Sequence, residues 1–177
     1  MKKVKKIQLK KIRKTDLPYF LKWWKDKELI SLTSGIYEKS NAVLSGCFFA
    51  MLKPGPDRHY LILLDKKPIG NISLSRKNKS TFECHIVIGE KKYRGKGFGR
   101  EALKLALSIA FNKLGYRHAD LEVRPDNERA IKTYKSIGFV EGGIKKYPKN
   151  KFQPMVLKMT LSKGRFIHDL QSPARKK

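Results

Sequence analysis

The chain has 177 residues, enough for one domain with a hydrophobic core, and its 41 lysines and arginines against 15 acidic residues give a formal net charge of +26. No uncharged stretch is long enough to cross a bilayer, the basic start lacks the apolar segment of a secretory signal, and two cysteines are too few for a disulfide scaffold. Four scattered histidines form no metal-binding pattern, so we expect a cytoplasmic domain that binds no metal.

Two thirds of the positive excess lies at the ends of the chain. Residues 1–14 carry a net charge of +8 and residues 144–177 carry +9, which leaves +9 for the middle. Such a field attracts polyanions: nucleic acid, a ribosome, an acidic membrane surface or a multiply phosphorylated cofactor. A lysine-rich genome or a heat-adapted surface is the compositional alternative. The excess of lysines (31) over arginines (10) favours this alternative, because dedicated phosphate-binding residues are more often arginine.

In the first half of the chain, hydrophobic periodicity predicts two helices and four strands. Apolar residues at helical spacing follow a capping residue and Pro18 in one segment, and the turn "KPGPD" ends another, so we expect helices over 15–29 and about 41–52. Loose alternation and β-branched residues predict strands over 4–13, 59–65, 68–76 and 81–89. The two middle strands are close enough in sequence to form a hairpin.

The second half predicts two more helices and two more strands. The apolar stretch 102–114 is long enough for a buried helix, with Gly115 as a natural stop. We expect further elements in the order strand, helix, strand over 116–124, 127–137 and 153–161. Residues 162–177 have the composition of a polar, basic and mobile tail. The mixture of helices and strands indicates an α+β or mixed α/β fold, in a single domain over residues 1–161.

A basic loop with alternating glycines joins the strand at 81–89 to the helix at 102–114. In "EKKYRGKGFGREAL" the spacing is not that of a dinucleotide fingerprint, because Arg100 occupies the third glycine position. It is not a P-loop either, because Gly97 and not a hydroxyl residue follows Lys96. A strand, a glycine loop and a helix N-terminus nevertheless form an anion site, where free N–H groups and the helix dipole point at one spot. The alternative is a flexible turn without a ligand.

Two motifs follow one another in the second half of the chain. The loop "YRGKGFG" fits the pattern Q/R-x-x-G-x-G/A at Arg94, Gly97 and Gly99. The stretch "LEVRPDNERAIKTYKSIGF" fits N-x-x-A-x-x-x-Y-x-x-x-G-F at Asn127, Ala130, Tyr134, Gly138 and Phe139. With both motifs the chain resembles the GNAT superfamily of acetyl-CoA-dependent N-acetyltransferases, which implies a central twisted mixed sheet of about six to seven strands flanked by helices. The segment "WWKDKEL" further resembles the branch that contains ribosomal-protein N-terminal acetyltransferases.

The resemblance implies acetyl-CoA as co-substrate and a set of residues that bind it. Backbone N–H groups of residues 94–100 would hold the coenzyme A pyrophosphate, with the basic side chains of the loop beside it. The preceding strand end would pair with the pantetheine arm, and the N–H of Ile88 would hold the oxyanion. Asn127 would hydrogen-bond the pantetheine, and small Ala130 would let it lie close. The expected cofactor-binding residues are Val87, Ile88, Gly89, Arg94, Gly95, Lys96, Gly97, Phe98, Gly99, Arg100, Asn127 and Ala130.

Acyl transfer to an amine needs one proton taken from the ammonium group and one given to the departing thiolate. By the same resemblance, Tyr134 is the candidate acid and Glu122 the candidate base. Each has a structural alternative: packing of Tyr134 against Phe139 alone, and pairing of Glu122 with Arg124 on the same strand face. An earlier strand carries two reserve bases, Glu83 and His85.

The resemblance also implies direct transfer in a ternary complex, with no acyl group on the enzyme. Cys47 and Cys84 are therefore expected to be small buried residues and not nucleophiles. Trp23 and Trp24 are expected in the core and not in the wall of an acceptor site.

Charge bears on the acceptor amine. A positive protein repels polycations such as polyamines and attracts an amine carried by something anionic, such as a ribosomal protein on RNA. A protein α-amine has a pKa of about 8, against about 10.4 for lysine, and needs less help from a base. We therefore expect a protein N-terminal acetyltransferase, with a small-molecule amine acetyltransferase second. A basic nucleic-acid-binding module on a catalytically weak GNAT scaffold is the alternative from another class. Ribosome or RNA association through the basic termini, as a monomer or homodimer, completes the expectation.

Overall fold

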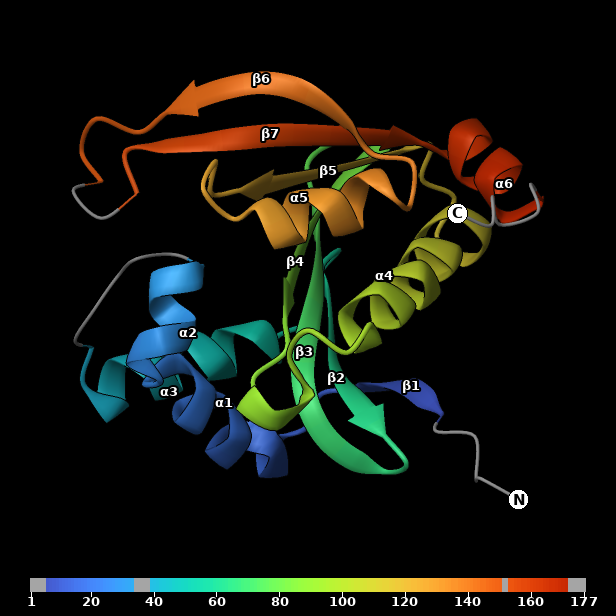
Figure 1. Cartoon of the computed structure of the whole chain (residues 1–177). Helices are drawn as coiled ribbons and strands as arrows, with labels where there is room; N and C mark the ends of the chain where they lie inside the picture. Colours follow the sequence, from blue (N-terminus) through green and yellow to red (C-terminus); the bar gives the residue numbers. More distant parts are fainter. Residues whose placement is uncertain (1–5, 34–38, 151–152, 172–177) are drawn as a thin grey trace.

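The fold is built on one seven-stranded mixed sheet, seen in a computed structural model that describes residues 6–33, 39–150 and 153–171. The strand order is β1-β2-β3-β4-β5-β7-β6, and every neighbouring pair is antiparallel except β4 with β5. The strands are β1 (Ile7–Lys11), β2 (Arg58–Leu64), β3 (Lys67–Arg76), β4 (Thr81–Val87), β5 (His118–Val123), β6 (Val140–Lys146) and β7 (Met155–Ser162). This sheet, flanked by helices, confirms the predicted mixed fold class (Figure 1).

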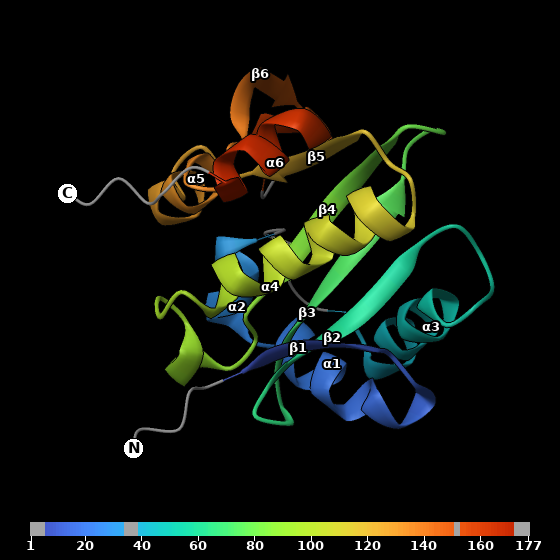
Figure 2. The ribbon, with the colours of Figure 1, turned by 90° about the vertical axis from the view of Figure 1, so that its right-hand side faces the viewer.

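Helices cover both faces of the sheet, as Figures 1 and 2 show. One face carries α1 (Leu17–Trp24), preceded by the 3-10 turn η1 (Lys14–Asp16), with α2 (Lys27–Leu32) and α3 (Asn41–Met51). The other face carries α4 (Phe98–Ser108), its π-helical continuation η3 (Ile109–Lys113), and α5 (Glu128–Lys135). The remaining elements are η2 (Lys91–Tyr93) and α6 (Lys163–Gln171).

Two hydrophobic cores hold these layers together. The larger core lies between the sheet and α4, α5 and α6, where Phe82, Ala106 and Leu121 are completely or almost completely buried. The smaller core joins α1 and α3 to β2 through residues that include Phe20 and Trp23. Trp23 thus belongs to the core, as expected.

The first predicted helix is in fact two helices, because Asp26 caps the second one. Its carboxylate accepts a hydrogen bond from the N–H of Leu29 at 3.0 Å, which begins α2 and ends the helical run of α1. The second predicted helix corresponds to α3, and the predicted hairpin to β2 and β3. In the hairpin, Asp65 and Lys66 have φ of +48° and +70°, as a tight turn between strands requires.

The two parallel strands of the sheet separate after a short ladder. β4 and β5 are paired only over Thr81–Glu83 and His118–Asp120. Beyond that point the facing backbones of the two strands are not paired with each other. The space between them belongs to a cleft that is also lined by residues of α5.

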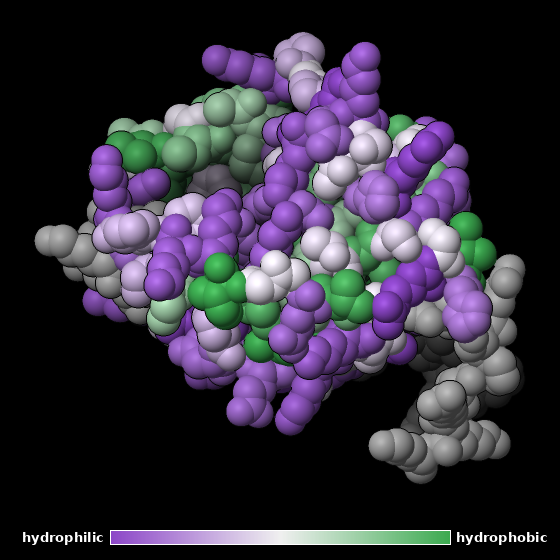
Figure 3. Space-filling view, turned by 90° about the horizontal axis from the view of Figure 1, so that it is seen from above, coloured by the Kyte–Doolittle hydropathy of each residue, from purple (hydrophilic) through white to green (hydrophobic). Residues whose placement is uncertain are grey.

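One strand was missed by the sequence interpretation. β6, with the sequence VEGGIKK, is exposed at every residue, so it shows no alternation of apolar and polar positions. Its pairing with β7 is interrupted between Glu141 and Ile144, and Gly143 has a φ of +95°. A glycine-rich edge strand of this kind carries almost no periodic signal. Figure 3 shows the surface over β6 and β7 as mostly hydrophilic, with separate hydrophobic residues between the polar ones.

The mobile tail expected from residue 162 does not begin there. Ser162 ends β7, and residues 163–171 form α6. Phe166 on this helix is 2% exposed and packs on Phe111, with ring centroids 5.5 Å apart. The charged residues around Phe166 hid this one anchoring side chain in the sequence. Residues 172–177 lie outside the described residues, as do residues 4 and 5 of the predicted opening strand.

No helix in the described parts of the chain is both long enough and apolar enough to cross a membrane.

Candidate active site

The cleft between β4 and β5 encloses a cavity of about 480 Å³. Its walls are β4 with the residues after it, the glycine loop, β5 and α5. Most of the sequence-predicted site residues line this cavity: Val87, Ile88, Arg94, Gly95, Gly97, Gly99, Arg100, Glu122, Asn127, Ala130 and Tyr134. The fold therefore brings together residues that are up to 47 positions apart in the sequence.

Three predicted cofactor-binding residues do not line the cavity. Gly89 lies directly against the ring of Trp23, which a Cβ at that position would overlap, so glycine is needed there for packing. Phe98 is only 9% exposed and packs on Tyr93, with ring centroids 5.9 Å apart. Lys96 is exposed to solvent outside the cavity wall.

The glycine loop has the backbone geometry of an anion site. Gly95 and Gly97 have φ of +73° and +83°, a region that other residues enter only with strain. Gly97 is also the N-cap of α4, whose eleven residues give the helix a full dipole. Because Gly97, Gly99 and Arg100 line the cavity, the first turn of α4 is directed at it.

Arg94 supports the loop from inside and is not available to a phosphate through its side chain. The guanidinium is 8% exposed, and its Nη2 donates to Asp26 Oδ2 and to the carbonyl of Gly89, both at 2.7 Å. Its Nε donates to the carbonyl of Ile88 at 3.0 Å. Burial raises the pKa of Asp26, but hydrogen bonds from Arg94 and the Leu29 amide outweigh this and leave the pKa below its usual value. Arg94 therefore ties α2 to the peptide groups that follow β4.

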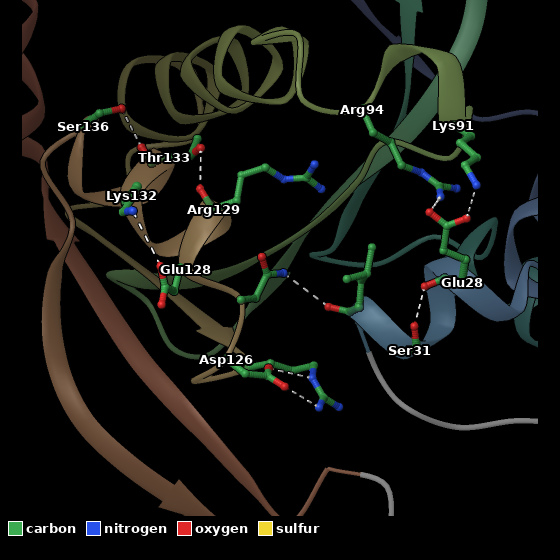
Figure 4. Close-up of a pocket in the computed structure, with 13 residues that line it drawn as sticks. Glu28, Ser31, Lys91, Arg94, Asp126, Glu128, Arg129, Lys132, Thr133 and Ser136 are labelled. Carbon is green, nitrogen blue, oxygen red and sulfur yellow. Dashed lines mark hydrogen bonds and ion pairs between the residues drawn. The ribbon is translucent and has the colours of Figure 1, made fainter.

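Arg129 is a cleft residue that sequence interpretation missed. It lines the cavity from the first turn of α5, and its Nη1 lies 3.4 Å from the position that a Cβ on Gly95 would occupy. In Figure 4 its side chain points into the open space, toward the side that carries Arg94 and Lys91. Its guanidinium has no ion-pair partner among the described residues. A cation in the first turn of a helix is unfavourable to the helix dipole. This unusual placement is the feature of the sequence that could have indicated a binding role for Arg129.

A second, wider cavity of about 1100 Å³ adjoins the first. The two share Arg94, Asn127 and Arg129, and the wider one extends outward between α2, η2 and α5 (Figure 4). Its rim is charged, with Lys91 paired to Glu28 at 2.7 Å. Together the two cavities offer a continuous site for a long ligand.

Tyr134 combines both roles that its motif allowed. Its ring lies 6.0 Å from that of Phe139, so it packs there, and it also lines the cavity. Burial, with a smaller effect from Cys84, raises the pKa of Tyr134 to about 12. The phenol therefore keeps its proton at neutral pH.

Asn127 begins α5 and connects it to α2. Its Oδ1 accepts a hydrogen bond from the N–H of Ala130 at 3.2 Å, as an N-cap does, and its Nδ2 donates to the carbonyl of Leu32 at 3.4 Å. Asn127, Ala130 and Tyr134 share one helix face, as the spacing predicted, and all three line the cleft.

Glu122 is held by the end of β6, the strand that sequence interpretation missed, and by Tyr147 directly after it. Its carboxylate oxygens accept from the Tyr147 hydroxyl at 2.9 and 2.8 Å, and Lys145 lies 3.0 Å away. The hydrogen bonds that Lys145 donates to Tyr147 and to Glu122 raise the pKa of Lys145. Arg124, the partner considered from sequence, contacts Asp126 at 2.9 Å.

The reserve bases, Glu83 and His85, lie on the same face of the sheet as Glu122. His85 Nε2 is 3.3 Å from Glu83 Oε1, and His85 lines the cavity. Glu83 is also 3.3 Å from Lys77. Cys84 between them is buried, as expected, and burial raises the pKa of its thiol. Cys47 is exposed, contrary to expectation, because it lies on the outer side of α3.

Comparison with known proteins agrees with this geometry. A family model for an acetyltransferase (GNAT) domain matches residues 6–140. The chain is 32% identical over 81 residues to the N-alpha-acetyltransferase RimI of Mycobacterium tuberculosis, covering 44% of this chain and 49% of that protein. It is 33% identical over 91 residues to spermidine N(1)-acetyltransferase of Escherichia coli K12, covering 50% of this chain and 48% of that protein. The chain thus spans about half the length of these two relatives.

The fold has a solved counterpart. The structure of spermidine N-acetyltransferase from Vibrio cholerae, in complex with CoA and spermine, superposes with a TM-score of 0.81 at 22% identity and covers 91% of this chain and 98% of that one. Three observations point to the same family: the family model matches most of the chain, the sheet has the corresponding topology, and residues of both motifs line one cleft. The chain therefore belongs to the GNAT acetyltransferase family.

Proposed function

We propose that this chain transfers the acetyl group of acetyl-CoA directly to a primary amine, and that this amine is the N-terminal α-amine of a protein. The observation that carries the proposal is the composition of the cleft walls. The glycine loop lies on one side, and Glu122 and Tyr134 lie on the other, where β4 and β5 have separated. One wall thus offers N–H groups to an anion, and the other offers a proton acceptor and a proton donor.

The cleft suits coenzyme A in three respects. Its volume of about 480 Å³ is in the range of small-molecule sites, about 300–1,000 Å³. A Cβ on Gly97 would meet no atom within 4 Å, so there is free space over the loop for a pyrophosphate. The edge of β4 beyond Glu83, unpaired with β5, offers backbone groups to the amides of a pantetheine arm.

The side chains of the cleft then divide the proton work. Acetyl-CoA, when bound, supplies a thioester that an amine can attack. Glu122 takes the proton of the incoming ammonium group, and the N–H of Ile88 stabilises the negative charge on the acetyl oxygen. Tyr134 donates its proton to the departing sulfur, because its raised pKa keeps it protonated.

Local electrostatics favour a single amine over a polyamine. On this face of the sheet, each of three carboxylates lies within 3.4 Å of a lysine. Lys77 contacts both Glu83 and Asp120. Lys158 also contacts Asp120, and Lys145 contacts Glu122. A polyamine binds well where several carboxylates lack such partners. Sequence similarity to spermidine acetyltransferases keeps a small-molecule amine as the second candidate.

An intact-mass screen with acetyl-CoA tests the proposal. One peptide has a free α-amine and no lysine, a second has the same sequence with a blocked N-terminus and one lysine, and spermidine is the third acceptor. We expect a mass increase of one acetyl group on the first peptide at neutral pH. Faster acetylation of spermidine would shift the assignment to a small-molecule enzyme. Acetylation of none of these acceptors would favour the catalytically weak nucleic-acid-binding alternative.

A further inference from the structure

A third cavity, of about 590 Å³, lies at the end of the sheet where the β4–β5 ladder is intact. It is bordered by the turn between β3 and β4, the start of β5, β6, the end of β7 and the first turn of α6. We call it the sheet-end groove and define it by Lys77, Asn78, His118, Lys158, Thr160 and Arg165. None of these residues belongs to the cleft described above.

Backbone hydrogen bonds gather distant basic segments around this groove. The carbonyl of Ser80 accepts from the N–H of Arg117 at 2.8 Å, and the carbonyl of Arg117 accepts from the N–H of Lys163 at 2.8 Å. These bonds bring the turn that carries Lys79 next to the first turn of α6, which carries Arg165. The groove is therefore a built feature of the fold and not a chance meeting of long side chains.

The groove has an excess of positive charge. Inside it, Asp120 holds Lys77 at 3.0 Å and Lys158 at 3.4 Å, which fixes both ammonium groups in place. Burial lowers the pKa of Lys77, but hydrogen bonds to Asp120 and Glu83 outweigh this and leave it above its usual value.

The basic residues around the groove add to this excess. Lys79, Arg117 and Arg165 are exposed and form no ion pair with any carboxylate whose side chain the structure describes. Five cations thus stand against the two carboxylates of Glu83 and Asp120. Asn78, Thr160 and neighbouring hydroxyl residues add neutral hydrogen-bond donors.

The groove and the candidate active site share one sheet face. Lys158 pairs in register with Glu122, and Asp120 precedes Glu122 by two residues on β5. Two residues of a strand span about 7 Å. A ligand in the groove would therefore lie beside the proposed base and on the side from which an acceptor can approach.

We infer that the sheet-end groove binds the phosphodiester backbone of a nucleic-acid strand. Ordered ammonium and guanidinium groups with hydroxyl donors suit successive phosphates, and a concave site suits a strand better than it suits a flat membrane surface. The described lining includes no aromatic ring except the imidazole of His118, so base stacking contributes little and binding is largely independent of sequence. A protein acceptor carried by the nucleic acid would then present its N-terminus next to Glu122.

Fluorescence anisotropy with a labelled single-stranded RNA of about 20 nucleotides, at several salt concentrations, tests the inference. The groove variant is Lys79→Glu/Arg117→Glu/Arg165→Glu. The matched control, Lys14→Glu/Lys53→Glu/Lys67→Glu, makes the same change in net charge at exposed lysines away from the groove. Removing three phosphate contacts should reduce the slope of log affinity against log salt by about 2 in the groove variant. The control should keep the parent's slope.

An equal reduction of the salt slope in both triple variants would overturn the inference, because the overall charge of the protein would then explain RNA binding. Absence of binding by the parent protein at low salt, or binding only to anionic lipid vesicles, would overturn it as well. A neutral variant, Lys79→Ser/Arg165→Ser, guards against misfolding when its melting temperature is measured alongside. It should show about two thirds of that reduction in slope, because it removes two of the three phosphate contacts. A DNA strand of the same sequence shows which part of the nucleic acid is recognised. Equal affinity for DNA and RNA indicates recognition of the phosphate backbone alone, and tighter RNA binding indicates contacts to the 2′-hydroxyl.

The readout is binding, so it stands apart from the proposed acetyl transfer. All variants keep the cleft residues, and acetylation of a free peptide should be unchanged in them. If the parent protein does not acetylate the free peptide, the proposed function is contradicted, but the inference about nucleic-acid binding in the sheet-end groove is not affected.

Discussion

Tyr134 and Glu122, the proposed acid and base, stand in contrasting surroundings. The phenol of Tyr134 is buried beside Phe139 and Cys84, where its pKa is raised to about 12. The carboxylate of Glu122 lies in a polar environment, within hydrogen-bond distance of Tyr147 and Lys145. A buried phenol and a carboxylate in a polar environment, both lining one cleft, suit the proposed acid and base.

Replacing Tyr134 with phenylalanine should remove catalysis and leave the fold intact. Tyr134→Phe keeps the packing on Phe139, so the melting temperature and the affinity for acetyl-CoA should barely change. The turnover number should fall by about 10²–10⁴-fold, the usual effect of one positioned acid. Steady-state kinetics on the free peptide measure this, and unchanged turnover would show that solvent protonates the leaving group.

Replacing Glu122 with glutamine should give a defect that depends on pH. Glu122→Gln keeps the shape and removes the base, so the loss should be largest at low pH, where the acceptor is an ammonium group. Activity should recover as the pH approaches the amine pKa of about 8, because the amine then loses its proton unaided. Tyr134→Phe should show no such recovery, which makes it the matched control. Full activity of Glu122→Gln at pH 7 would point to His85 with Glu83, which touch each other at 3.3 Å.

At the residue scale, the sequence predicted the cleft residues that belong to motifs and missed those that arrive by tertiary contact. Asn127, Ala130 and Tyr134 were predictable because helical spacing alone puts them on one face. Tyr147 was not, because it reaches Glu122 from 25 residues away through a strand with no periodic signal. Arg94 was predicted by its motif, but only the structure shows that its side chain is committed to Asp26.

At the scale of elements, predictions succeeded where burial is one-sided. The strand–loop–helix unit around Gly97 was predictable, because β4 and α4 each bury one face and the glycines mark the turn between them. The sequence did not predict β6, because no residue of this strand is buried. It did not predict α6, because the burial of this helix depends on one phenylalanine. The break between α1 and α2 was hidden because the charged run 25–28 can also continue a helix, while the signal was a capping aspartate inside that run.

A pair of glycine variants separates ligand binding from backbone strain. Gly97 and Gly115 both have positive φ, +83° and +76°, and a Cβ at either would meet no atom within 4 Å. Gly97→Leu and Gly115→Leu should therefore cost similar stability, about 1–2 kcal/mol each. Acetyl-CoA should raise the melting temperature of Gly115→Leu as it does that of the parent, and less so at high salt. Gly97→Leu should show no rise, because its side chain fills the space over the loop, and a rise equal to the parent's would mean that the loop is only a turn.

At the scale of the whole molecule, the net charge of +26 and the domain boundary have to be considered together. Removing residues 162–177 is an obvious way to test whether the basic end recruits a polyanion. The deletion would also remove Phe166 from the larger core and the hydrogen bond from Lys163 Nζ to the carbonyl of Phe111, 3.0 Å long. Weaker binding after such a truncation could therefore reflect unfolding, and only substitutions of exposed cations separate charge from stability.

The role of α6 in the core can be measured directly. Phe166 is 2% exposed, whereas its neighbour Ile167 is 38% exposed, so one helix supplies both a core position and its control. Phe166→Ala should lower the free energy of unfolding by about 3–5 kcal/mol, through lost burial and the cavity left against Phe111. Such a loss is a large part of a typical total of about 5–15 kcal/mol. Ile167→Ala should lower the free energy of unfolding by clearly less than Phe166→Ala, because Ile167 is smaller and 38% of its surface stays in contact with water. Urea unfolding followed by circular dichroism measures both values. If the two variants unfold at the same urea concentration, α6 is not a structural part of the domain, and truncation at residue 162 becomes a valid test of the basic end.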